Sequence, residues 1–472
     1  MIELTCDEVA TATAGQLSNP SAGAVIVDGV TADSRLVPEG RPLFVALATA
    51  SADGHDHARA AVAAGAVAVL ATRPLDVEVP VVVVDDTWQA LRRLATEVRS
   101  RVGPMAVGIT GSVGKTTVKD LTAAAVGASR RTHAAQGSYN NELGVPLTVL
   151  GMPADTEVLV AEVGARRSGN IAELAPVVAP DVAVVTAVAP AHLGVFGSIE
   201  AIAATKAELV ESLGPRGVAV LHLADERVAA MADRAPRVVT VAADRPDADV
   251  HARGVVLDRR ARARGTAVTP WGEVAFALPV AGRHHVVNAL FALAVAGELG
   301  VDLGAAAAAI ATAEVSPWRA AVLEYGAVTV LDDAYNASPT AVGAALETLR
   351  AIEGPGRRIA VLGRMAELGA DGASAHRELG ARCAELGVDH LLVVGDPSDP
   401  DAEVAPLAVG ARAAGVPAVT EVADATQAAS LITRLVRPGD VVLVKASRIV
   451  GLERVVAALA AAAADRDQEG PA

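Results

Sequence analysis

Gly108-Ile-Thr-Gly-Ser-Val-Gly-Lys-Thr-Thr117 is the stretch of the chain that decides the fold. It follows a short apolar run, Met105-Ala-Val107, and it opens a helical pattern at Lys115. The pattern therefore predicts a strand, a glycine-rich turn and a helix. In such a turn several backbone N–H groups converge at the positive end of the helix dipole, and this arrangement suits the phosphates of a nucleotide.

The side chains of this loop have distinct expected roles. Lys115 would reach the outer phosphates of ATP or GTP, and the hydroxyl of Thr116 would hold Mg²⁺. Ile109 stands where the general phosphate-loop pattern has glycine, so the match is to the narrower form T-G-x-x-G-K-T-T. The structural alternative is a glycine-rich turn with an incidental lysine. The predicted nucleotide contacts of the loop are Gly111, Ser112, Gly114, Lys115, Thr116 and Thr117.

Composition narrows the class of protein. The length of 472 residues suits about three domains, and the net charge of −15 argues against a nucleic-acid partner. Cys6 and Cys383 lie far apart and match no metal spacing, which is typical of a reduced, cytoplasmic protein. The acidic start of the chain does not resemble a secretory signal. The uncharged stretch 182–199 contains proline and histidine, so a strand with a loop is favoured over a membrane span.

Apolar β-branched runs alternate with alanine-rich helical patterns along the chain, and this alternation predicts an α/β fold. The linker candidates Gly103-Pro104 and Ser316-Pro317 divide the chain into residues 1–103, 104–315 and 316–472. We expect a small α/β domain first, then a parallel sheet of the P-loop ATPase type. A Rossmann-like, doubly wound domain follows.

Two parts of this pattern are specific enough to test. Around Thr269-Pro-Trp-Gly272 short strands replace the alternation, which predicts an antiparallel hairpin appended to the central parallel sheet. In the third domain the predicted strands are 328–332, 358–362, 390–394, 418–422 and 441–444.

Polar residues at three places point to a metal site beside the phosphate loop. Glu162 ends an apolar strand, where a carboxylate is a natural ligand of Mg²⁺. His192 lies in the loop after the next strand and could reach the same ion. Lys206 lies in a helical pattern, where an exposed side chain is the usual interpretation.

Other candidates carry two interpretations each. Asn140 and Asn141 either form an Asx turn that caps the next helix or contact a ligand. Asn288 could hydrogen-bond an adenine, and Arg319 could clamp a γ-phosphate from across a cleft. The cluster Asp332-Asp-Ala-Tyr-Asn336 could bind a ribose or a second metal, although a surface cap or an ion pair would explain it equally well.

Taken together, these residues resemble the Mur ligase family of ATP-dependent amide ligases, in the same order along almost the whole chain. The motifs that carry the resemblance are Thr110-Gly-Ser-Val-Gly-Lys-Thr-Thr117, Tyr139-Asn-Asn-Glu-Leu-Gly-Val-Pro146, Glu162-Val-Gly-Ala165, Ala191-His-Leu-Gly194, Lys206, Asn288-Ala-Leu290, Trp318-Arg319 and Asp332-Asp-Ala-Tyr-Asn-Ala337. Within the family the chain is most similar to members that add D-alanyl-D-alanine. The motifs for that branch are Thr31-Ala-Asp-Ser-Arg35, Leu362-Gly-Arg-Met-Ala-Glu-Leu-Gly369 and Val444-Lys-Ala-Ser-Arg448.

The resemblance implies an ADP-forming carboxylate–amine ligase of peptidoglycan precursor synthesis, on which cell shape and division depend. Its substrates would be ATP, a UDP-linked muramoyl tripeptide and D-alanyl-D-alanine, with Mg²⁺ as cofactor and a monomer as the expected form. The first domain would bind the UDP-sugar peptide and the second ATP. The third would contribute to ATP and amine binding, and it would have to close onto the phosphate loop.

The resemblance also implies roles for single residues. Catalytic roles would fall to Lys115, His192, Lys206 and Arg319. The metal ligands would be Thr116, Glu162, His192 and Lys206, the last as a carbamate. Besides the loop, the nucleotide would contact Asn288, Arg319 and Asp333. The peptide substrate would contact Ser34, Arg35, Asn140, Asn141 and Asn336.

Four places depart from the family pattern. Ile449-Val450 replaces smaller or more polar residues after Ser447-Arg448. Arg364 stands where an acid is usual, Asn170 where glutamate is common, and His285 where asparagine is usual. Two alternatives stay open, and Arg364 and Asn170 suggest the first of them. One is a paralogous ligase that forms a different amide in secondary metabolism, and the other is a non-catalytic nucleotide-binding homologue.

Overall fold

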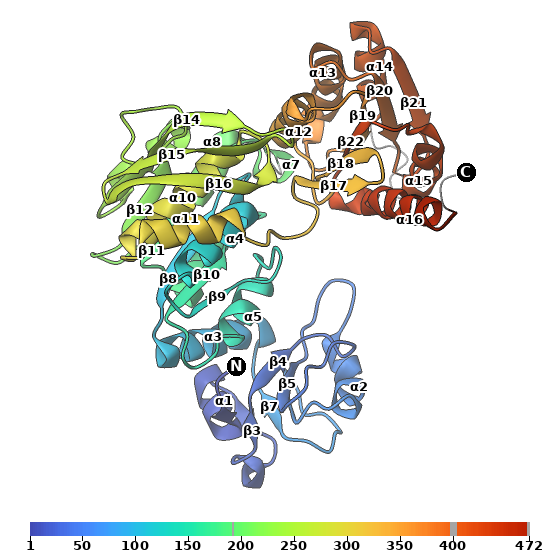
Figure 1. The fold of residues 1–472 in the computed structure, drawn as a ribbon. Coiled ribbons are helices and arrows are strands. Elements are labelled where there is room, and N and C mark those ends of the chain that lie inside the picture. The colour runs from blue at the N-terminus through green and yellow to red at the C-terminus, as the bar shows by residue number, and fades with distance from the viewer. Residues whose placement is uncertain (191–192, 397–403, 470–472) are drawn as a thin grey trace.

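The chain forms three α/β units, and the predicted fold class is confirmed (Figure 1). The structure is a computed structural model that describes residues 1–190, 193–396 and 404–469. In Figure 1 the N-terminal unit lies at the bottom, the central unit above it, and the C-terminal unit at the upper right. None of the helices among the described residues combines the length and the apolarity needed to span a bilayer.

The N-terminal unit is built on a five-stranded sheet of order β2-β7-β6-β5-β4, parallel except where β2 meets β7. The strands are β2 (Gln16–Leu17), β4 (Gly29–Thr31), β5 (Pro42–Val45), β6 (Ala68–Ala71) and β7 (Val81–Val83), with a separate pair of β1 (Leu4–Thr5) and β3 (Ile26–Val27). The helices are α1 (Cys6–Thr13), α2 (Ala58–Ala63) and α3 (Thr87–Val102).

Helix α3 joins the first unit to the second. Its buried residues Leu91 and Leu94 belong to one apolar cluster with Val9 of α1 and Leu159 of the central unit. The helix ends at Gly103, whose φ of 66° gives the left-handed cap that glycine adopts without strain, and Pro104 follows. A shared core therefore holds the two units together across the Gly103-Pro104 linker.

The central unit has a six-stranded parallel sheet of order β13-β12-β11-β8-β10-β9. Its strands are β8 (Met105–Thr110), β9 (Thr132–Ala134), β10 (Val158–Glu162), β11 (Val182–Val185), β12 (Val218–His222) and β13 (Val238–Val241). Its helices are α4 (Lys115–Gly127), α5 (Gly144–Leu150), α6 (Asn170–Val178), α7 (Leu193–Phe196), α8 (Ile199–Glu211), α9 (Glu226–Ala229), α10 (His285–Glu298) and α11 (Leu303–Ala311). The order of the strands reverses at β8, and open α/β sheets bind ligands at such a point.

Ile109 belongs to strand β8 and not to the turn that follows it. Its side chain is fully buried in one cluster with Val118 and Leu121 of α4. A glycine here would leave a cavity in that cluster. The departure from the general loop pattern is therefore a matter of core packing.

The predicted hairpin is present, but it is part of a separate three-stranded antiparallel sheet. Its strands are β14 (His251–Leu257), β15 (Arg262–Thr269) and β16 (Gly272–Ala281). The turn lies at Thr269, whose hydroxyl donates to the carbonyl of Gly272 at 2.7 Å. Phe276 and Leu278 bury this sheet against the same cluster as α10 and α11.

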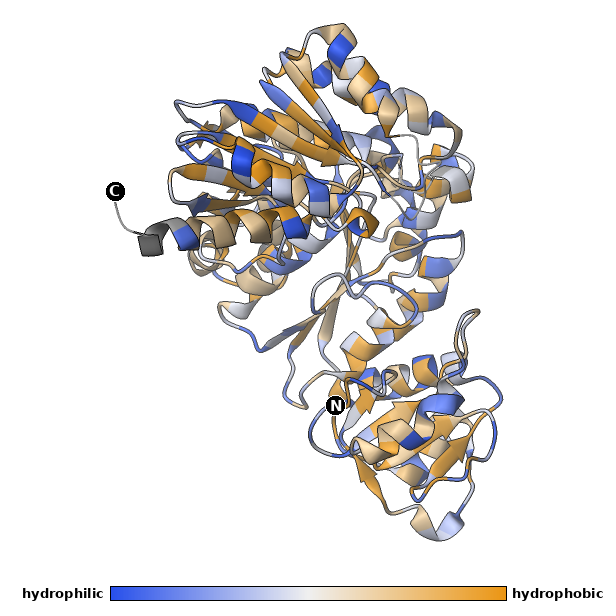
Figure 2. Ribbon diagram, turned by 90° about the vertical axis from the view of Figure 1, so that its right-hand side faces the viewer, coloured by the Kyte–Doolittle hydropathy of each residue, from blue (hydrophilic) through white to orange (hydrophobic). Residues whose placement is uncertain are grey.

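The C-terminal unit has a six-stranded sheet of order β17-β18-β22-β19-β20-β21, in which only β17 is antiparallel. The strands are β17 (Ala321–Tyr325), β18 (Val328–Asp332), β19 (Arg358–Gly363), β20 (His390–Val394), β21 (Ala418–Val422) and β22 (Val441–Lys445). The helices are α12 (Pro339–Ala351), α13 (Gly372–Glu385), α14 (Ala405–Ala414), α15 (Ala425–Leu435) and α16 (Glu453–Glu469). All five predicted strands are present, and β17 is the edge strand that the sequence pattern missed. Figure 2 shows the strands mainly in the orange of hydrophobic residues, as expected for a sheet covered on both faces.

Candidate active site

One cavity of about 1660 Å³ is lined by residues of all three units, at the carboxyl end of β8. The phosphate-loop turn forms one wall. Gly111 and Gly114 have φ values of 141° and 84°, and a Cβ on Gly111 would lie only 2.0 Å from the hydroxyl of Thr186. Both positions therefore require glycine. Thr117 at the start of α4 lines the cavity as well.

Lys115 is partly buried in this loop and lies along it. Its Nζ donates to the carbonyl oxygens of Gly111 at 2.8 Å and Ser112 at 3.4 Å. Burial lowers the pKa of Lys115, the nearby Glu162 carboxylate opposes this shift, and Arg319 adds to it. The Ser112 hydroxyl and Nε of Arg319 are buried without a hydrogen-bond partner among the described residues. A cation and unpaired donors around a loop of converging N–H groups fit a polyphosphate.

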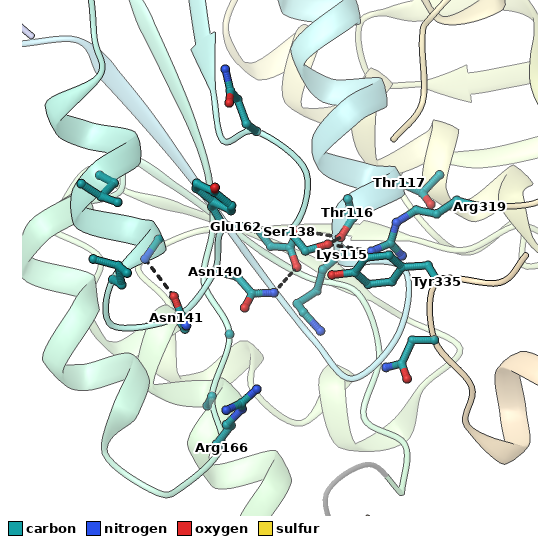
Figure 3. Close-up of a pocket in the computed structure, with 18 of the residues that line it drawn as sticks. Lys115, Thr116, Thr117, Ser138, Asn140, Asn141, Glu162, Arg166, Arg319 and Tyr335 are labelled. Carbon is teal, nitrogen blue, oxygen red and sulfur yellow. Dashed lines mark hydrogen bonds between the residues drawn. The ribbon is translucent and has the colours of Figure 1, made fainter. Parts of the chain in front are cut away.

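Glu162 is the centre of a network at the carboxyl end of β10 (Figure 3). Its side chain is 1% exposed, and both carboxylate oxygens accept hydrogen bonds. Thr116 donates to Oε2 at 2.7 Å, and Nδ2 of Asn140 donates to Oε1 at 2.6 Å. A buried carboxylate beside a hydroxyl and a phosphate loop is a donor set that suits a hard divalent cation.

The two asparagines of the neighbouring loop take different parts, although sequence alone left both alternatives open for each. Oδ1 of Asn141 accepts the N–H of Gly144 at 2.8 Å, a local bond at the start of α5, and Asn141 also lines the cavity. Asn140 instead reaches Glu162 in the cavity.

Lys206 lies on α8, and its side chain is 4% exposed, not solvated as the usual interpretation of a helical lysine would have it. Burial, with a smaller contribution from the Lys115 charge, lowers the pKa of Lys206 to about 7. A substantial fraction of this amine is therefore neutral near pH 7. The remaining predicted metal ligand, His192, lies outside the described residues.

Arg319 comes from the linker into the C-terminal unit and already lies against the phosphate loop. Its Nη2 donates to the hydroxyl of Ser138 at 2.8 Å, and Ser138 lies 3.1 Å from Oγ1 of Thr116. The guanidinium stacks over the Tyr335 ring at 4.1 Å from its centroid. The sequence separation suggested that the third unit must close to bring Arg319 here. In this structure it is already in contact, as Figure 3 shows.

The cluster after β18 also lines the cavity. Lys445 donates to Oδ2 of Asp333 at 2.6 Å and to the carbonyl of Asn336 at 2.8 Å. Oδ1 of Asp333 accepts the N–H of Ala320 at 3.2 Å. Asp333, Asn336 and Lys445 all line the cavity.

Ser138, Tyr335 and Lys445 also line the cavity, although the sequence did not predict them as site residues. Their contacts in the folded protein identify them as site residues. A short sequence motif shows neither how buried a side chain is nor which residue it contacts.

Asn288 of α10 lies against the phosphate turn. Its side chain is 6% exposed, Nδ2 donates to Nδ1 of His285 at 2.9 Å, and Oδ1 is close to Gly114. Burial lowers the pKa of His285 well below its usual value, so its ring is neutral. Nε2 of His285 is buried without a partner among the described residues, and His285 lines the cavity.

Ser34 and Arg35 lie on the N-terminal wall of the same cavity. The Arg35 guanidinium pairs with Asp33 at 2.7 Å, and this contact lowers the pKa of Asp33 to about 2. The predicted contacts for the peptide substrate thus share one cavity with the phosphate loop.

The departures at Arg364 and Asn170 are each balanced locally. Arg364 pairs at 3.6 Å with Asp396, which follows β20, so its charge is offset by a neighbouring strand end. Asn170 is 1% exposed, and its Oδ1 accepts the N–H of Arg167 at 3.1 Å while Nδ2 donates to Glu142 at 3.1 Å. A glutamate in place of Asn170 would put two carboxylates in contact.

Known proteins resemble this chain along its whole length. Three family descriptions match it: "Mur ligase family, catalytic domain" at residues 26–100, "Mur ligase middle domain" at 109–296, and "Mur ligase, glutamate ligase domain" at 318–448. The UDP-N-acetylmuramoyl-tripeptide–D-alanyl-D-alanine ligase of Mycobacterium tuberculosis is 42% identical, with 98% of each chain covered. The ligase of that name from Escherichia coli is 34% identical, covering 97% of this chain and 99% of its own.

Solved structures agree with these relatives. MurF from Acinetobacter baumannii superposes with a TM-score of 0.87 at 29% identity, covering 97% of this chain and 99% of its own. MurF from Thermotoga maritima, solved in complex with ADP, superposes with a TM-score of 0.80 at 29% identity, covering 93% and 99%.

Proposed function

Because this chain belongs to the Mur ligase family, we propose that it joins D-alanyl-D-alanine to a UDP-N-acetylmuramoyl-tripeptide with the conversion of ATP to ADP and phosphate. The observation that carries the proposal is the meeting of Lys115, Glu162 and Arg319 in one cavity that also reaches Arg35 of the N-terminal unit. Such a cavity can hold a nucleotide and a long substrate end to end. Since ATP and UDP-activated precursors are cytoplasmic, the reaction belongs to that compartment.

The reaction needs charge neutralisation and alignment more than it needs a nucleophilic side chain. The terminal carboxylate of the tripeptide attacks the γ-phosphorus of ATP, the bond to the bridging oxygen breaks, and ADP leaves. The amine of the dipeptide then attacks the acyl carbon, loses a proton, and inorganic phosphate leaves. Lys115 and Arg319 would balance the phosphate charge in the first step, and the loop N–H groups would hold the phosphates in line.

The division of work among the units follows from their place on the cavity. Residues 1–103, with Ser34 and Arg35, would bind the UDP-sugar. Residues 104–315 would bind ATP, with His285 and Asn288 at the nucleotide. Residues 316–472, with Asp333 and Asn336, would hold the ribose and the incoming amine.

Thr116 and Glu162 are the residues that would hold Mg²⁺, and Lys206 and His192 would hold a second ion. The bound cation would lower the repulsion between the carboxylate and the phosphates. The buried, partly neutral amine of Lys206 supports its proposed carbamate form, because only a neutral amine adds to carbon dioxide.

A phosphate-release assay that crosses UDP-peptides with dipeptides and amino acids tests the proposal. We expect ADP and phosphate only when the UDP-tripeptide and D-alanyl-D-alanine are both present. Turnover only with another amine would contradict it in favour of a paralogue, and nucleotide binding without turnover on any pair would indicate a non-catalytic homologue.

Replacement of Lys206 by alanine is expected to lower kcat by at least about 10²-fold, without rescue by bicarbonate. Lys206→Arg should be equally inactive, because arginine keeps a charge but forms no carbamate. In the wild type, activity should rise as the pH increases through about 7, since the amine must lose its proton before it can react. Steady-state kinetics at fixed bicarbonate measures both effects, and near-normal turnover of Lys206→Arg would refute the carbamate.

A further inference from the structure

Helix α4 carries a buried ion pair one turn beyond the phosphate loop. Nζ of Lys119 lies 2.6 Å from Oδ1 of Asp120, and the two side chains are 3% and 9% exposed. Neither residue lines the cavity. A buried ion pair is a weak source of stability, because desolvation offsets most of the attraction between its charges. Stability alone therefore does not explain why this ion pair is present.

Each member of the pair holds a different segment of the site. Lys119 donates to the carbonyl oxygens of Ala135 at 2.7 Å and Gly137 at 3.1 Å. Oδ2 of Asp120 accepts the N–H of Ser316 at 2.8 Å. The ion pair thus ties the loop before Ser138 to the start of the linker into the C-terminal unit.

These two segments meet again in the cavity. Ser138 follows Gly137 directly, and Arg319 follows Ser316 by three residues. The Arg319 guanidinium donates to the Ser138 hydroxyl at 2.8 Å. The contacts therefore close a ring that starts and ends on α4, the same helix that begins at Lys115.

The backbone of the linker around Arg319 is strained and needs contacts with its surroundings to keep its conformation. Trp318 and Ala320 have φ values of 62° and 50°, a region in which residues with a Cβ are strained. Such a conformation persists only where its surroundings fix it. Here the anchors are Asp120 on the N–H of Ser316, Tyr335 N–H on the Trp318 carbonyl at 3.2 Å, Asp333 on the N–H of Ala320, and Ala281 N–H on the Ala320 carbonyl at 3.1 Å.

We propose that Asp120, paired with Lys119, is a positioning residue that sets Arg319 over the phosphate loop by anchoring the N–H of Ser316. This inference rests on the proposed function, because it concerns where Arg319 stands during phosphoryl transfer. Asp120 acts through Arg319 and touches neither the nucleotide nor the peptide. Among these anchors Asp120 supplies a side chain from the nucleotide-binding unit, on the helix that begins at the phosphate loop.

A double-mutant cycle tests this coupling. Asp120→Ala should lower kcat roughly 10- to 100-fold, the size of effect that a small misplacement of a catalytic group produces. In the Arg319→Ala background the same change should lower kcat less than about twofold, because the group that it positions is already gone. Independent, multiplicative losses in the two backgrounds would overturn the proposal.

Controls separate positioning from folding. Asp424→Ala removes another aspartate that accepts a backbone N–H, at the start of α15 and away from the cavity, and should leave kcat unchanged. If Asp120→Ala leaves Lys119 unpaired and unfolds the protein, the apolar pair Lys119→Met with Asp120→Leu removes both charges, so that no unpaired charge is left in the core. That pair should show the same kcat loss and the same coupling to Arg319, and wild-type kcat in it would refute the anchor.

The cycle is repeated on the affinity for AMPPCP, a non-hydrolysable ATP analogue, by calorimetry. This measurement needs no peptide substrate. Coupled losses of affinity at Asp120 and Arg319 support the anchor even if the wild type fails to turn over the proposed substrates. Additive losses refute it even if the wild type is an active ligase.

Discussion

Replacement of Arg319 by alanine is expected to lower kcat by about 10³-fold while the protein remains folded. The guanidinium is held at the phosphate loop from two sides, by Ser138 at 2.8 Å and by the Tyr335 ring at 4.1 Å. A cation fixed in place before the reaction stabilises the charge that develops on a transferring phosphoryl group without reorganisation. Phosphate release at saturating ATP and peptide measures the loss.

Two further variants show which property of Arg319 matters. Arg319→Lys should recover only part of the activity, because an ammonium group lacks the planar fork and the stacking of a guanidinium. Tyr335→Phe keeps the aromatic face and should stay near wild type. The affinity for ADP should change little in Arg319→Ala, since ADP lacks the γ-phosphate. A loss of kcat below about tenfold would show that Arg319 does not act on the transferring group.

The second large effect is expected at Glu162. Glu162→Gln should lower kcat by about 10²- to 10³-fold and should raise the Mg²⁺ concentration needed for half-maximal rate. Both carboxylate oxygens are acceptors, for Thr116 at 2.7 Å and Asn140 at 2.6 Å, and an amide can replace only one of them. The NH₂ group of the glutamine would face one of these two hydrogen-bond donors at a position where the side chain is 1% exposed. The hydrogen-bond network would therefore break, and the site would also lose its negative charge.

Glu173→Gln is the matched control for this change. Glu173 lies on α6 of the same unit and pairs with Arg167 at 2.8 Å, but it is partly exposed and does not line the cavity. Its replacement should alter neither kcat nor the Mg²⁺ dependence. Titration of Mg²⁺ at fixed ATP compares the two variants, and an unchanged dependence in Glu162→Gln would exclude Glu162 as a ligand.

The sequence by itself determined the fold class and the main strands and helices of the protein. The strand, glycine turn and helix at Thr110–Thr117 can be recognised in the sequence. The turn needs glycine where φ is positive and lysine where the helix starts, so these residue types occur at a fixed spacing. The parallel strands of the C-terminal unit are recognisable because a strand buried on both faces is a continuous apolar run. Edge strand β17 was missed because its residues are mostly half-buried and carry no such run.

Only the tertiary structure decided what each polar residue does. Asn140 and Asn141 are chemically identical neighbours that both line the cavity, yet one donates to Glu162 and the other accepts the N–H of Gly144. In the sequence Lys206 cannot be distinguished from an ordinary exposed lysine of a helix. In the folded protein the packing of α8 buries its amine, and this burial lowers the pKa of Lys206. The approach of Arg319 to Ser138 joins residues 181 positions apart. No local pattern encodes such a contact, because it depends on how three units pack around one cavity.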